Sequence, residues 1–152
     1  MTRAAIALGS NLGDREGWLR QGADALRAAF PTLRLSSLHE TAYVGGGPVQ
    51  SAYLNAAATL ETAHSPRAFL DLLLDTERDA HRERPYQDAP RTLDLDLILF
   101  GDEIIDAPGL QVPHPRFRQR RFVLAPLAEI ASDWRDPVTG RTIEELLRAL
   151  DG

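Results

Sequence analysis

Residues 91–100 read Arg-Thr-Leu-Asp-Leu-Asp-Leu-Ile-Leu-Phe, and they form the clearest strand pattern in the chain. Because side chains alternate between the two faces of a strand, one face is wholly apolar and must be buried. That face consists of Leu93, Leu95, Leu97 and Leu99. Asp94 and Asp96 point the other way, about 6.6 Å apart along the chain. Ile98 and Phe100 continue this second face, which is therefore not simply solvent-exposed.

Two neighbouring carboxylates on a partly buried face repel each other, and each raises the proton affinity of the other. A divalent cation removes this conflict, and magnesium prefers carboxylate and phosphate oxygens. The alternative is an edge strand with two solvated aspartates. Aspartate is unfavourable in strands, and Arg91 lies three residues before Asp94. The pattern therefore favours a metal site at Asp94 and Asp96.

The remaining patterns predict an α+β protein with helices packed on a mostly antiparallel sheet. We expect further strands over residues 4–8, 33–41 and 53–60, and a hairpin that pairs residues 93–100 with 103–105. We expect a helix after the cap residue Asp14, a second after Ser65-Pro66, a third over 123–130 and a last one capped by Thr142. Strands and helices alternate too irregularly for a doubly wound parallel sheet. Length and the lack of a linker predict a single domain over residues 1–152.

Composition excludes several classes of function. The chain has 152 residues, a net charge of −5 and no cysteine, so a thiolate nucleophile, a disulfide framework and a cysteine-ligated zinc are excluded. The negative charge argues against nucleic-acid binding. No apolar run approaches the roughly 20 residues that span a bilayer, and no signal peptide is apparent. We therefore expect a cytoplasmic protein, without a membrane partner, that acts as a monomer.

All 17 basic residues are arginines, so a P-loop with its lysine is excluded. Three of them, Arg82, Arg84 and Arg91, flank the loop before the aspartate strand, and four follow His114: Arg116, Arg118, Arg120 and Arg121. Guanidinium groups bind phosphate oxygens bidentately and keep their proton. Two such groups beside a carboxylate pair suit a polyphosphate, although for any single arginine a solvated surface position is the better explanation. His114, between two prolines, either donates to a phosphate or is a structural loop residue.

Tyr53 and Asn55 share one face of the strand over 53–60, whereas Leu54, Ala56, Ala58 and Leu60 supply the core face. An amide offers a donor and an acceptor to the edge of a flat heterocycle, and an aromatic ring packs beside one. Many strands carry such a pair, so this indication is weak by itself. The glycines at 45–47 predict a mobile loop that could close over a substrate.

Together these motifs resemble the 6-hydroxymethyl-7,8-dihydropterin pyrophosphokinase family of the folate pathway. The resemblance runs nearly from end to end and is most specific in Pro-Arg-Thr-Leu-Asp-Leu-Asp at 90–96. It includes Gly-Ser-Asn-Leu-Gly at 9–13, Glu-Thr at 40–41, Tyr-Leu-Asn-Ala at 53–56, Arg-x-Arg at 82–84, Val-Pro-His at 112–114, Arg120, Phe122, Pro-Leu at 126–127 and Glu-Ile at 129–130. Asp88-Ala89 stands where many members carry Trp-Gly, and Ala42 where they often carry proline.

The resemblance implies a ferredoxin-like fold, ATP as co-substrate, two magnesium ions, and products AMP and the pterin diphosphate. By matching positions, Asp94 and Asp96 are implied as metal ligands and catalytic residues, together with the catalytic arginines Arg82, Arg84 and Arg91. The resemblance implies nucleotide contacts from Glu77, Arg82, Arg84, Arg91, Ile98, His114 and Arg120. It implies pterin contacts from Thr41, Val44, Tyr53, Asn55 and Phe122. We expect no dedicated general base.

Two other functions remain open from the sequence. One is a non-catalytic ligand-binding module that kept the fold, which predicts loss of the aspartates or loop arginines, and all are present. The other is a different Asp-x-Asp metal enzyme, such as a nucleotidyl or glycosyl transferase. The nucleotide product, AMP or ADP, separates this second possibility from pyrophosphate transfer.

Overall fold

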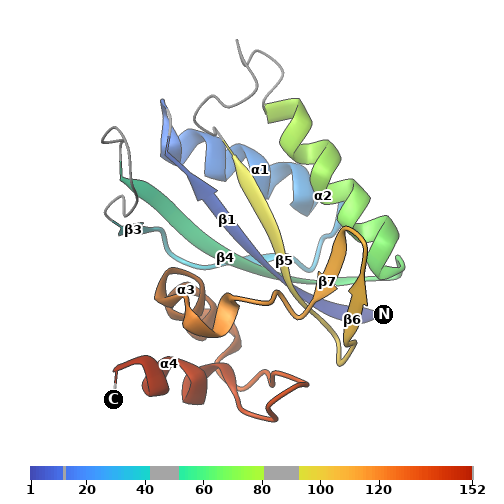
Figure 1. The fold of residues 1–152 in the computed structure, drawn as a ribbon. Coiled ribbons are helices and arrows are strands. Elements are labelled where there is room, and N and C mark those ends of the chain that lie inside the picture. The colour runs from blue at the N-terminus through green and yellow to red at the C-terminus, as the bar shows by residue number, and fades with distance from the viewer. Residues whose placement is uncertain (12, 42–51, 81–92, 152) are drawn as a thin grey trace.

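A computed structural model describes residues 1–11, 13–41, 52–80 and 93–151 (Figure 1). In this part of the chain the main sheet is built from β1 (Thr2–Ser10), β2 (Arg34–Leu35), β3 (His39–Thr41), β4 (Tyr53–Thr62) and β5 (Asp94–Phe100). A separate two-stranded ribbon consists of β6 (Ile105–Ala107) and β7 (Leu110–Val112). The helices are α1 (Arg15–Ala29), α2 (Pro66–Ala80), α3 (Arg121–Ala131), α4 (Ile143–Asp151) and the short 3-10 helix η1 (Phe117–Gln119).

The first strand lies at the centre of the sheet, between β4 and β5, and β2 and β3 both pair with the outer side of β4. Each of these pairings is antiparallel. The chain order is β1, α1, the two segments β2 and β3, then β4, α2 and β5. This is the β-α-β-β-α-β order of ferredoxin-like folds. The predicted α+β class with an antiparallel sheet is confirmed.

Three helices begin at the cap residues that the sequence predicts. Asp14 accepts a hydrogen bond from the amide of Gly17 at 3.0 Å, and Ser65 Oγ accepts from the amide of Ala68 at 3.2 Å. Thr142 and Glu145 each accept from the other's backbone amide, both at 3.1 Å. These bonds satisfy amide donors that the first turn of a helix leaves without a backbone partner.

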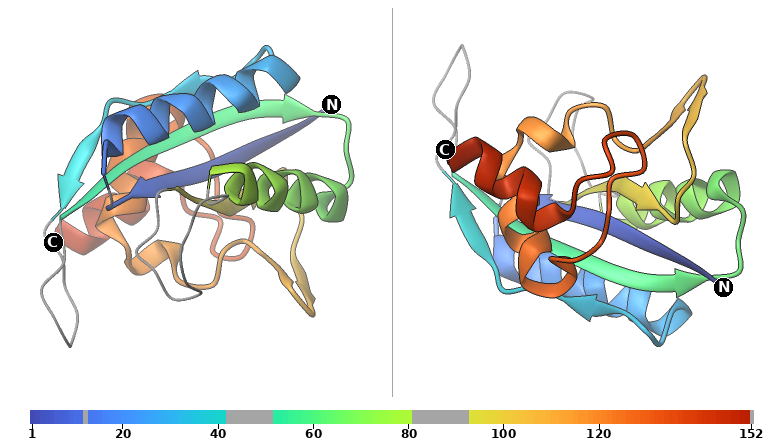
Figure 2. Two further views of the ribbon diagram at one scale, coloured as in Figure 1. Left: turned by 90° about the horizontal axis from the view of Figure 1, so that it is seen from above. Right: turned by 90° about the horizontal axis from the view of Figure 1, so that it is seen from below.

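The sheet separates two apolar cores. On one face, α1 and α2 pack against leucines of β5 and the even-numbered apolar residues of β1 and β4 (Figure 2). On the other face, α3 packs against β4 and β1, and α4 packs on α3. This second core is built around Ala5, Ala57, Leu99, Phe117, Val123, Leu124, Leu127 and Ile143. α3 covers only part of this face (Figure 1).

A β-bulge changes the predicted faces of β5. Ala5 pairs with Leu99 and Ile6 with Leu97, so Ile98 is an extra residue in β5 at this point. Leu93, Leu95 and Leu97 lie in the first core as predicted, but Leu99 lies in the second core and Phe100 in the first. The predicted uniform alternation through residue 100 is therefore wrong, because a bulge inserts one residue and reverses the phase beyond it.

Two further predictions are corrected. The strand expected over 33–41 divides into β2 and β3, because the Ser36 side chain takes the place of a backbone acceptor: its Oγ accepts from the amide of Ala57 at 2.8 Å. The hairpin expected between β5 and residues 103–105 does not form, since β6 pairs with β7 instead. Within the described ranges, no helix is both long and apolar enough to cross a membrane.

Candidate active site

The site begins with small residues in the central strand. Gly9 pairs with Asn55 of β4 on one side and with Asp94 of β5 on the other. Two strand spacings separate Asn55 from Asp94, about 10 Å. Ala7 occupies the next position on the same face and pairs with Asp96. The sheet therefore presents an amide on one strand and two carboxylates on another, with almost no side-chain volume between them.

A cleft of about 540 Å³ opens above this floor. Seven of the residues predicted for the site line it: Thr41, Tyr53, Asn55, Asp94, Asp96, Arg120 and Phe122. The other described lining residues are Ala7, Leu8 and Gly9. Residues more than 80 positions apart in the sequence thus meet at one end of the sheet, next to the first turn of α3.

Polar and aromatic groups in this cleft are held in place. Asn55 is 5% exposed, and its Nδ2 donates to Thr41 Oγ1 at 2.8 Å. This bond orients the amide, so that its oxygen and its second N–H are the groups left for other contacts. Phe122 is 39% exposed, and the Arg120 guanidinium lies 5.5 Å from the centre of its ring. A cation beside an aromatic face is a favourable arrangement, which keeps both side chains at the cleft.

A second cleft, of about 750 Å³, shares Asp94 and Asp96 with the first. It lies between α2, β5 and the β6–β7 ribbon, and its described lining also includes Leu70, Leu74, Glu77, Leu95, Leu97, Gly109, Leu110, Gln111, His114 and Pro115. The two aspartates are therefore the boundary between two compartments. One compartment has an amide and aromatic rings, and the other has an apolar helix face and a histidine.

Glu77, in the last turn of α2, contributes in a specific way. Its Oε2 accepts a hydrogen bond from the backbone amide of Leu95 at 2.7 Å. Leu95 stands between the two aspartates, so this bond ties α2 to the strand segment that carries them. The predicted nucleotide role of Glu77 stays a prediction, while its contact with the aspartate strand is direct.

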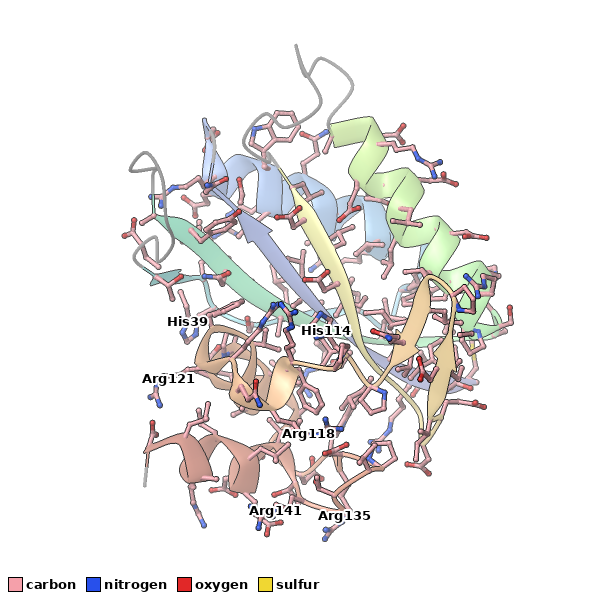
Figure 3. The ribbon with its side chains drawn as sticks, viewed as in Figure 1. His39, His114, Arg118, Arg121, Arg135 and Arg141 are labelled. Carbon is pink, nitrogen blue, oxygen red and sulfur yellow. The ribbon has the colours of Figure 1, made fainter. Side chains whose placement is uncertain are left out.

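His114 lies against the bulge of β5 (Figure 3). Its backbone amide donates to the Ile98 carbonyl at 3.0 Å, and its Nδ1 accepts from the amide of Arg116 at 3.1 Å. Burial lowers the pKa of His114, as do the nearby Arg120 and Arg116 charges, against an opposing effect of Asp96. The ring is therefore neutral at pH 7, and because Nδ1 accepts, the proton is on Nε2.

Ile98 and three of the arginines after His114 occupy other places. Ile98 is buried in the second core and contacts this region through its carbonyl group. Arg118 pairs with the buried Asp136, and Arg121 pairs with Asp151 at the end of α4 (Figure 3). Of the four arginines 116, 118, 120 and 121, only Arg120 is among the described residues that line either cleft. The four do not form one constellation.

Several predicted residues lie outside the described part of the chain: Val44, Arg82, Arg84, Arg91 and the glycines at 45–47. Both gaps in the description adjoin the first cleft in sequence, since Thr41 precedes one and Leu93-Asp94 follow the other. The sequence reasoning missed the role of Gly9 and Ala7 as the floor. The signal was available in the alternation of β1, where residues 5, 7 and 9 are all small.

Comparison with known proteins finds relatives along most of the chain. The sequence profile of the 7,8-dihydro-6-hydroxymethylpterin-pyrophosphokinase (HPPK) family matches residues 5–132. The 2-amino-4-hydroxy-6-hydroxymethyldihydropteridine pyrophosphokinase of Bacillus subtilis is 42% identical over 144 residues, which cover 93% of this chain and 86% of that protein. The protein of the same name from Pseudomonas aeruginosa is 40% identical over 150 residues, covering 97% of this chain and 91% of that protein.

Solved structures share the fold. An HPPK-DHPS in complex with substrates superposes with a TM-score of 0.70 at 12% identity, and a Plasmodium falciparum HPPK-DHPS triple mutant with a TM-score of 0.68 at 15% identity. Each match covers 97% of this chain, which spans only 43% and 41% of those longer chains. At this identity the structures show the fold alone. The family profile and the relatives show more: the chain belongs to the 7,8-dihydro-6-hydroxymethylpterin-pyrophosphokinase family.

Proposed function

We propose that this chain transfers the terminal pyrophosphate of ATP to the hydroxymethyl group of 6-hydroxymethyl-7,8-dihydropterin, releasing AMP, in folate biosynthesis. The single observation that carries this proposal is the meeting of two clefts at Asp94 and Asp96. A reaction between two substrates needs both to be held with their reacting atoms adjacent. Two compartments with different linings, joined at a pair of carboxylates, provide that arrangement.

The carboxylate pair fits magnesium. Across the described ranges, no group of three or more acidic, histidine or cysteine side chains surrounds a point where it could hold a metal. Magnesium does not need such a cage, because it commonly binds one or two protein carboxylates together with water and substrate phosphates. Asp94 and Asp96, open to both clefts, are such a donor set. When bound there, the metal would neutralise charge on the phosphate oxygens, and we propose two ions.

The pterin would occupy the first cleft. A flat heterocycle fits above Gly9 and Ala7, because these residues leave the centre of the floor open. Asn55, oriented by Thr41, would exchange hydrogen bonds with the edge of the ring system. Tyr53 and Phe122 would pack beside its faces, and the hydroxymethyl group would then point toward the aspartates. Val44 is proposed to add a backbone contact from outside the described residues.

The nucleotide would occupy the second cleft. His114 would donate from Nε2 to a phosphate oxygen, since its Nδ1 already accepts from the chain. Arg120, beside the shared aspartates, would contact phosphate from the pterin side. Ile98 would act through its carbonyl, which holds the His114 backbone, and Glu77 by fixing β5. Arg82, Arg84 and Arg91 are proposed to complete the phosphate contacts.

The protein's work in this reaction is positioning and charge stabilisation. The hydroxyl oxygen of the pterin attacks the β-phosphorus in line and gives up its proton to solvent, the bond between the β-phosphorus and the α-phosphate oxygen breaks, and AMP leaves. No histidine is among the described residues that line the first cleft, so we propose that no dedicated base is required. We further propose that residues 1–152 form one catalytic domain that acts as a monomer in the cytoplasm.

The test is product analysis. With ATP, magnesium and the hydroxymethyl dihydropterin, we expect AMP to form in step with loss of the pterin. Asp94→Asn and Asp96→Asn should each reduce kcat by about 1,000-fold or more, because each removes charge at the reacting centre. Asp102→Asn, in the turn after β5, is the matched control and should leave kcat unchanged.

Other outcomes separate the alternatives. Release of ADP, or nucleotide turnover that does not depend on the pterin, would indicate a different Asp-x-Asp enzyme. Pterin binding without any turnover would indicate a binding module. Near-normal activity in either aspartate variant would refute the metal assignment.

A further inference from the structure

β3 is only three residues long, yet each of its side chains bonds to a different element. His39 Nε2 lies 2.6 Å from Glu129 Oε2 of α3, and Glu40 accepts from Arg15 Nη1 of α1 at 2.8 Å. Thr41 Oγ1 accepts from Asn55 of β4. Thr41 lines the first cleft and orients Asn55. The position of this short edge segment therefore affects the part of the cleft that would hold the pterin.

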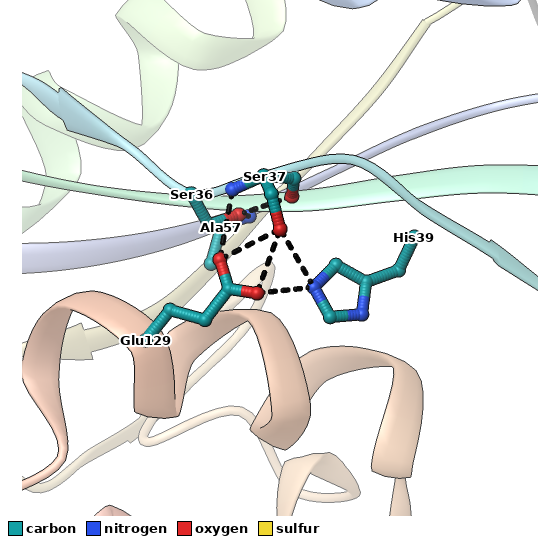
Figure 4. Close-up of polar contacts among 5 residues, drawn as sticks. All are labelled: Ser36, Ser37, His39, Ala57 and Glu129. Carbon is teal, nitrogen blue, oxygen red and sulfur yellow. Dashed lines mark hydrogen bonds and ion pairs between the residues drawn. The ribbon is translucent and has the colours of Figure 1, made fainter.

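Glu129 of α3 contacts both Ser37, just before β3, and His39 in it (Figure 4). Its Oε1 accepts from the Ser37 amide at 2.8 Å and from Ser37 Oγ at 2.9 Å. Its Oε2 lies 2.7 Å from Ser37 Oγ and 2.6 Å from His39 Nε2. Burial by itself raises the pKa of Glu129, but the hydrogen bonds from Ser37 and His39 together lower it by more. The pKa of Glu129 is therefore below its ordinary value. The carboxylate is charged at neutral pH and holds two residues of the chain at once.

A serine, a histidine and a glutamate in contact suggest a catalytic triad, but the geometry excludes it. In a triad the histidine uses one ring nitrogen for the serine and the other for the carboxylate. Here Ser37 Oγ, at 3.3 Å, and Glu129 both contact Nε2. Ser37 also donates directly to Glu129, which does not activate its oxygen as a nucleophile. The cluster is suited to hold position.

The face of α3 that carries Glu129 also carries a residue of the first cleft, Phe122. Phe122 and Glu129 are seven residues apart, which is almost two full helical turns, so they lie on one face about 10.5 Å apart along the axis. Phe122 lines the first cleft and Glu129 contacts the segment before Thr41. The same helix thus carries one lining residue of the cleft and the carboxylate that holds the segment leading to another lining residue, Thr41.

We propose that Glu129 is a positioning residue that fixes the width of the pterin compartment, by holding the segment from Ser37 to Thr41 at a set distance from α3. This inference rests on the proposed function, because it assigns the first cleft to the pterin. Glu129 contacts no substrate in this account. Its effect passes through Thr41 and Asn55 on one side and through Phe122 on the other.

The test compares two Glu129 variants with a matched glutamate. Glu129→Ala should raise KM for the pterin about tenfold while kcat and KM for ATP stay within about twofold, since a tenfold change corresponds to roughly one hydrogen-bond contribution. Glu129→Gln, which keeps an acceptor, should restore part of the loss. Glu145→Ala removes a similar carboxylate from the start of α4, where it bonds Thr142, and should leave the pterin KM unchanged.

A second variant guards against a folding defect. Ser37 is exposed, so its substitution should not disturb the core. Ser37→Ala removes the hydroxyl bonds to the Glu129 carboxylate and should raise the pterin KM. The double variant with Glu129→Ala should show less than the sum of the two single effects. An unchanged pterin KM in Glu129→Ala and Ser37→Ala overturns the inference, as does an equal rise in both KM values, which would indicate general loosening. Should wild-type protein make no AMP, the proposed function fails, and equilibrium titration with the pterin alone still measures whether Glu129→Ala weakens binding.

Discussion

Asp136 gives the sharpest test of which arginines serve the structure and which serve catalysis. Its side chain is fully buried, and its carboxylate accepts from Arg118 Nε at 2.5 Å and Nη2 at 2.8 Å. It also accepts from the Val138 amide at 3.0 Å and from Thr139 Oγ1 at 2.7 Å. Four donors therefore converge on one carboxylate. Asp136→Asn keeps the shape but removes the charge and turns one acceptor into a donor that faces donors.

The expected cost is about 3 kcal/mol in the free energy of unfolding, because breaking a buried pair leaves a partly buried guanidinium without compensation. In a protein of this size that corresponds to a decrease in Tm of about 6–12 °C. Urea unfolding followed by circular dichroism measures the free energy. The kcat and both KM values of the folded variant should stay within about twofold of wild type, because Arg118 is not among the described residues that line either cleft.

The pH dependence of this difference follows from the pKa of Asp136. Burial raises that pKa, but the hydrogen bonds from Arg118, Thr139 and Val138 outweigh the effect and lower it. A carboxyl group with a lowered folded pKa stabilises the protein at pH values above its unfolded pKa, near 4, and this stabilisation is lost as the pH falls further. The gap in unfolding free energy between wild type and Asp136→Asn should be constant from about pH 5 to 8 and shrink below about pH 4.

A raised KM for ATP in Asp136→Asn, with little loss of stability, would refute this reasoning. It would mean that Arg118 contacts phosphate and that Asp136 only directs it. Arg118→Met is the companion variant. We expect it to lose stability and to keep its KM for ATP.

Two further predictions concern glycines, one on the cleft floor and one in α1 against the core. In Gly9→Ala, the new methyl would lie 3.5 Å from Asn55 Oδ1 and 3.7 Å from Tyr53 Cδ1, so the fold and the urea midpoint should be unchanged. Because the methyl would occupy the cleft floor, the KM for the pterin should rise about tenfold. In Gly22→Ala, the methyl would lie 2.9 Å from Leu93 Cδ2, and overpacking of about 1–3 kcal/mol should outweigh a helix-propensity gain of about 1 kcal/mol. Adding Leu93→Val should recover stability in urea unfolding, whereas a stabilised Gly22→Ala would show that the core yields at this point.

Much of the fold was predictable because local rules and the global fold agree. Cap residues such as Asp14, Ser65 and Thr142 each carry the hydrogen-bonding group that a helix start requires, and all three are confirmed. The alternation in β4 correctly placed Asn55 on one face and Ala56 in the core on the other. These features depend on neighbours in sequence, so a single chain reveals them.

The errors arose where partners distant in sequence decide the structure. Ile98 becomes a bulge because β1 and β5 shift register there, and its free carbonyl is then taken by the amide of His114. The local residue pattern of β5 does not predict this change of register. Ser36 likewise ends β2 by bonding Ala57, 21 positions away. Side-chain partners of this kind also explain Arg118 and Arg121, which the sequence grouped with Arg120 only by their position after His114 and which are ion-paired elsewhere.

The location of the site follows from the sizes of the residues on one face of the sheet. Along the central strand, Ala5, Ala7 and Gly9 succeed one another on that face. At Ala5 the missing volume is filled by side chains of α3, which packs closely there. Near Gly9, Phe122 in the first turn is the one residue of α3 among the described lining residues. The small side chains of β1 therefore leave an open cleft at this end. A run of small residues is thus a packing surface at one end and a binding floor at the other, and the polar residues Asn55 and Asp94 flank it at Gly9, where the floor is open.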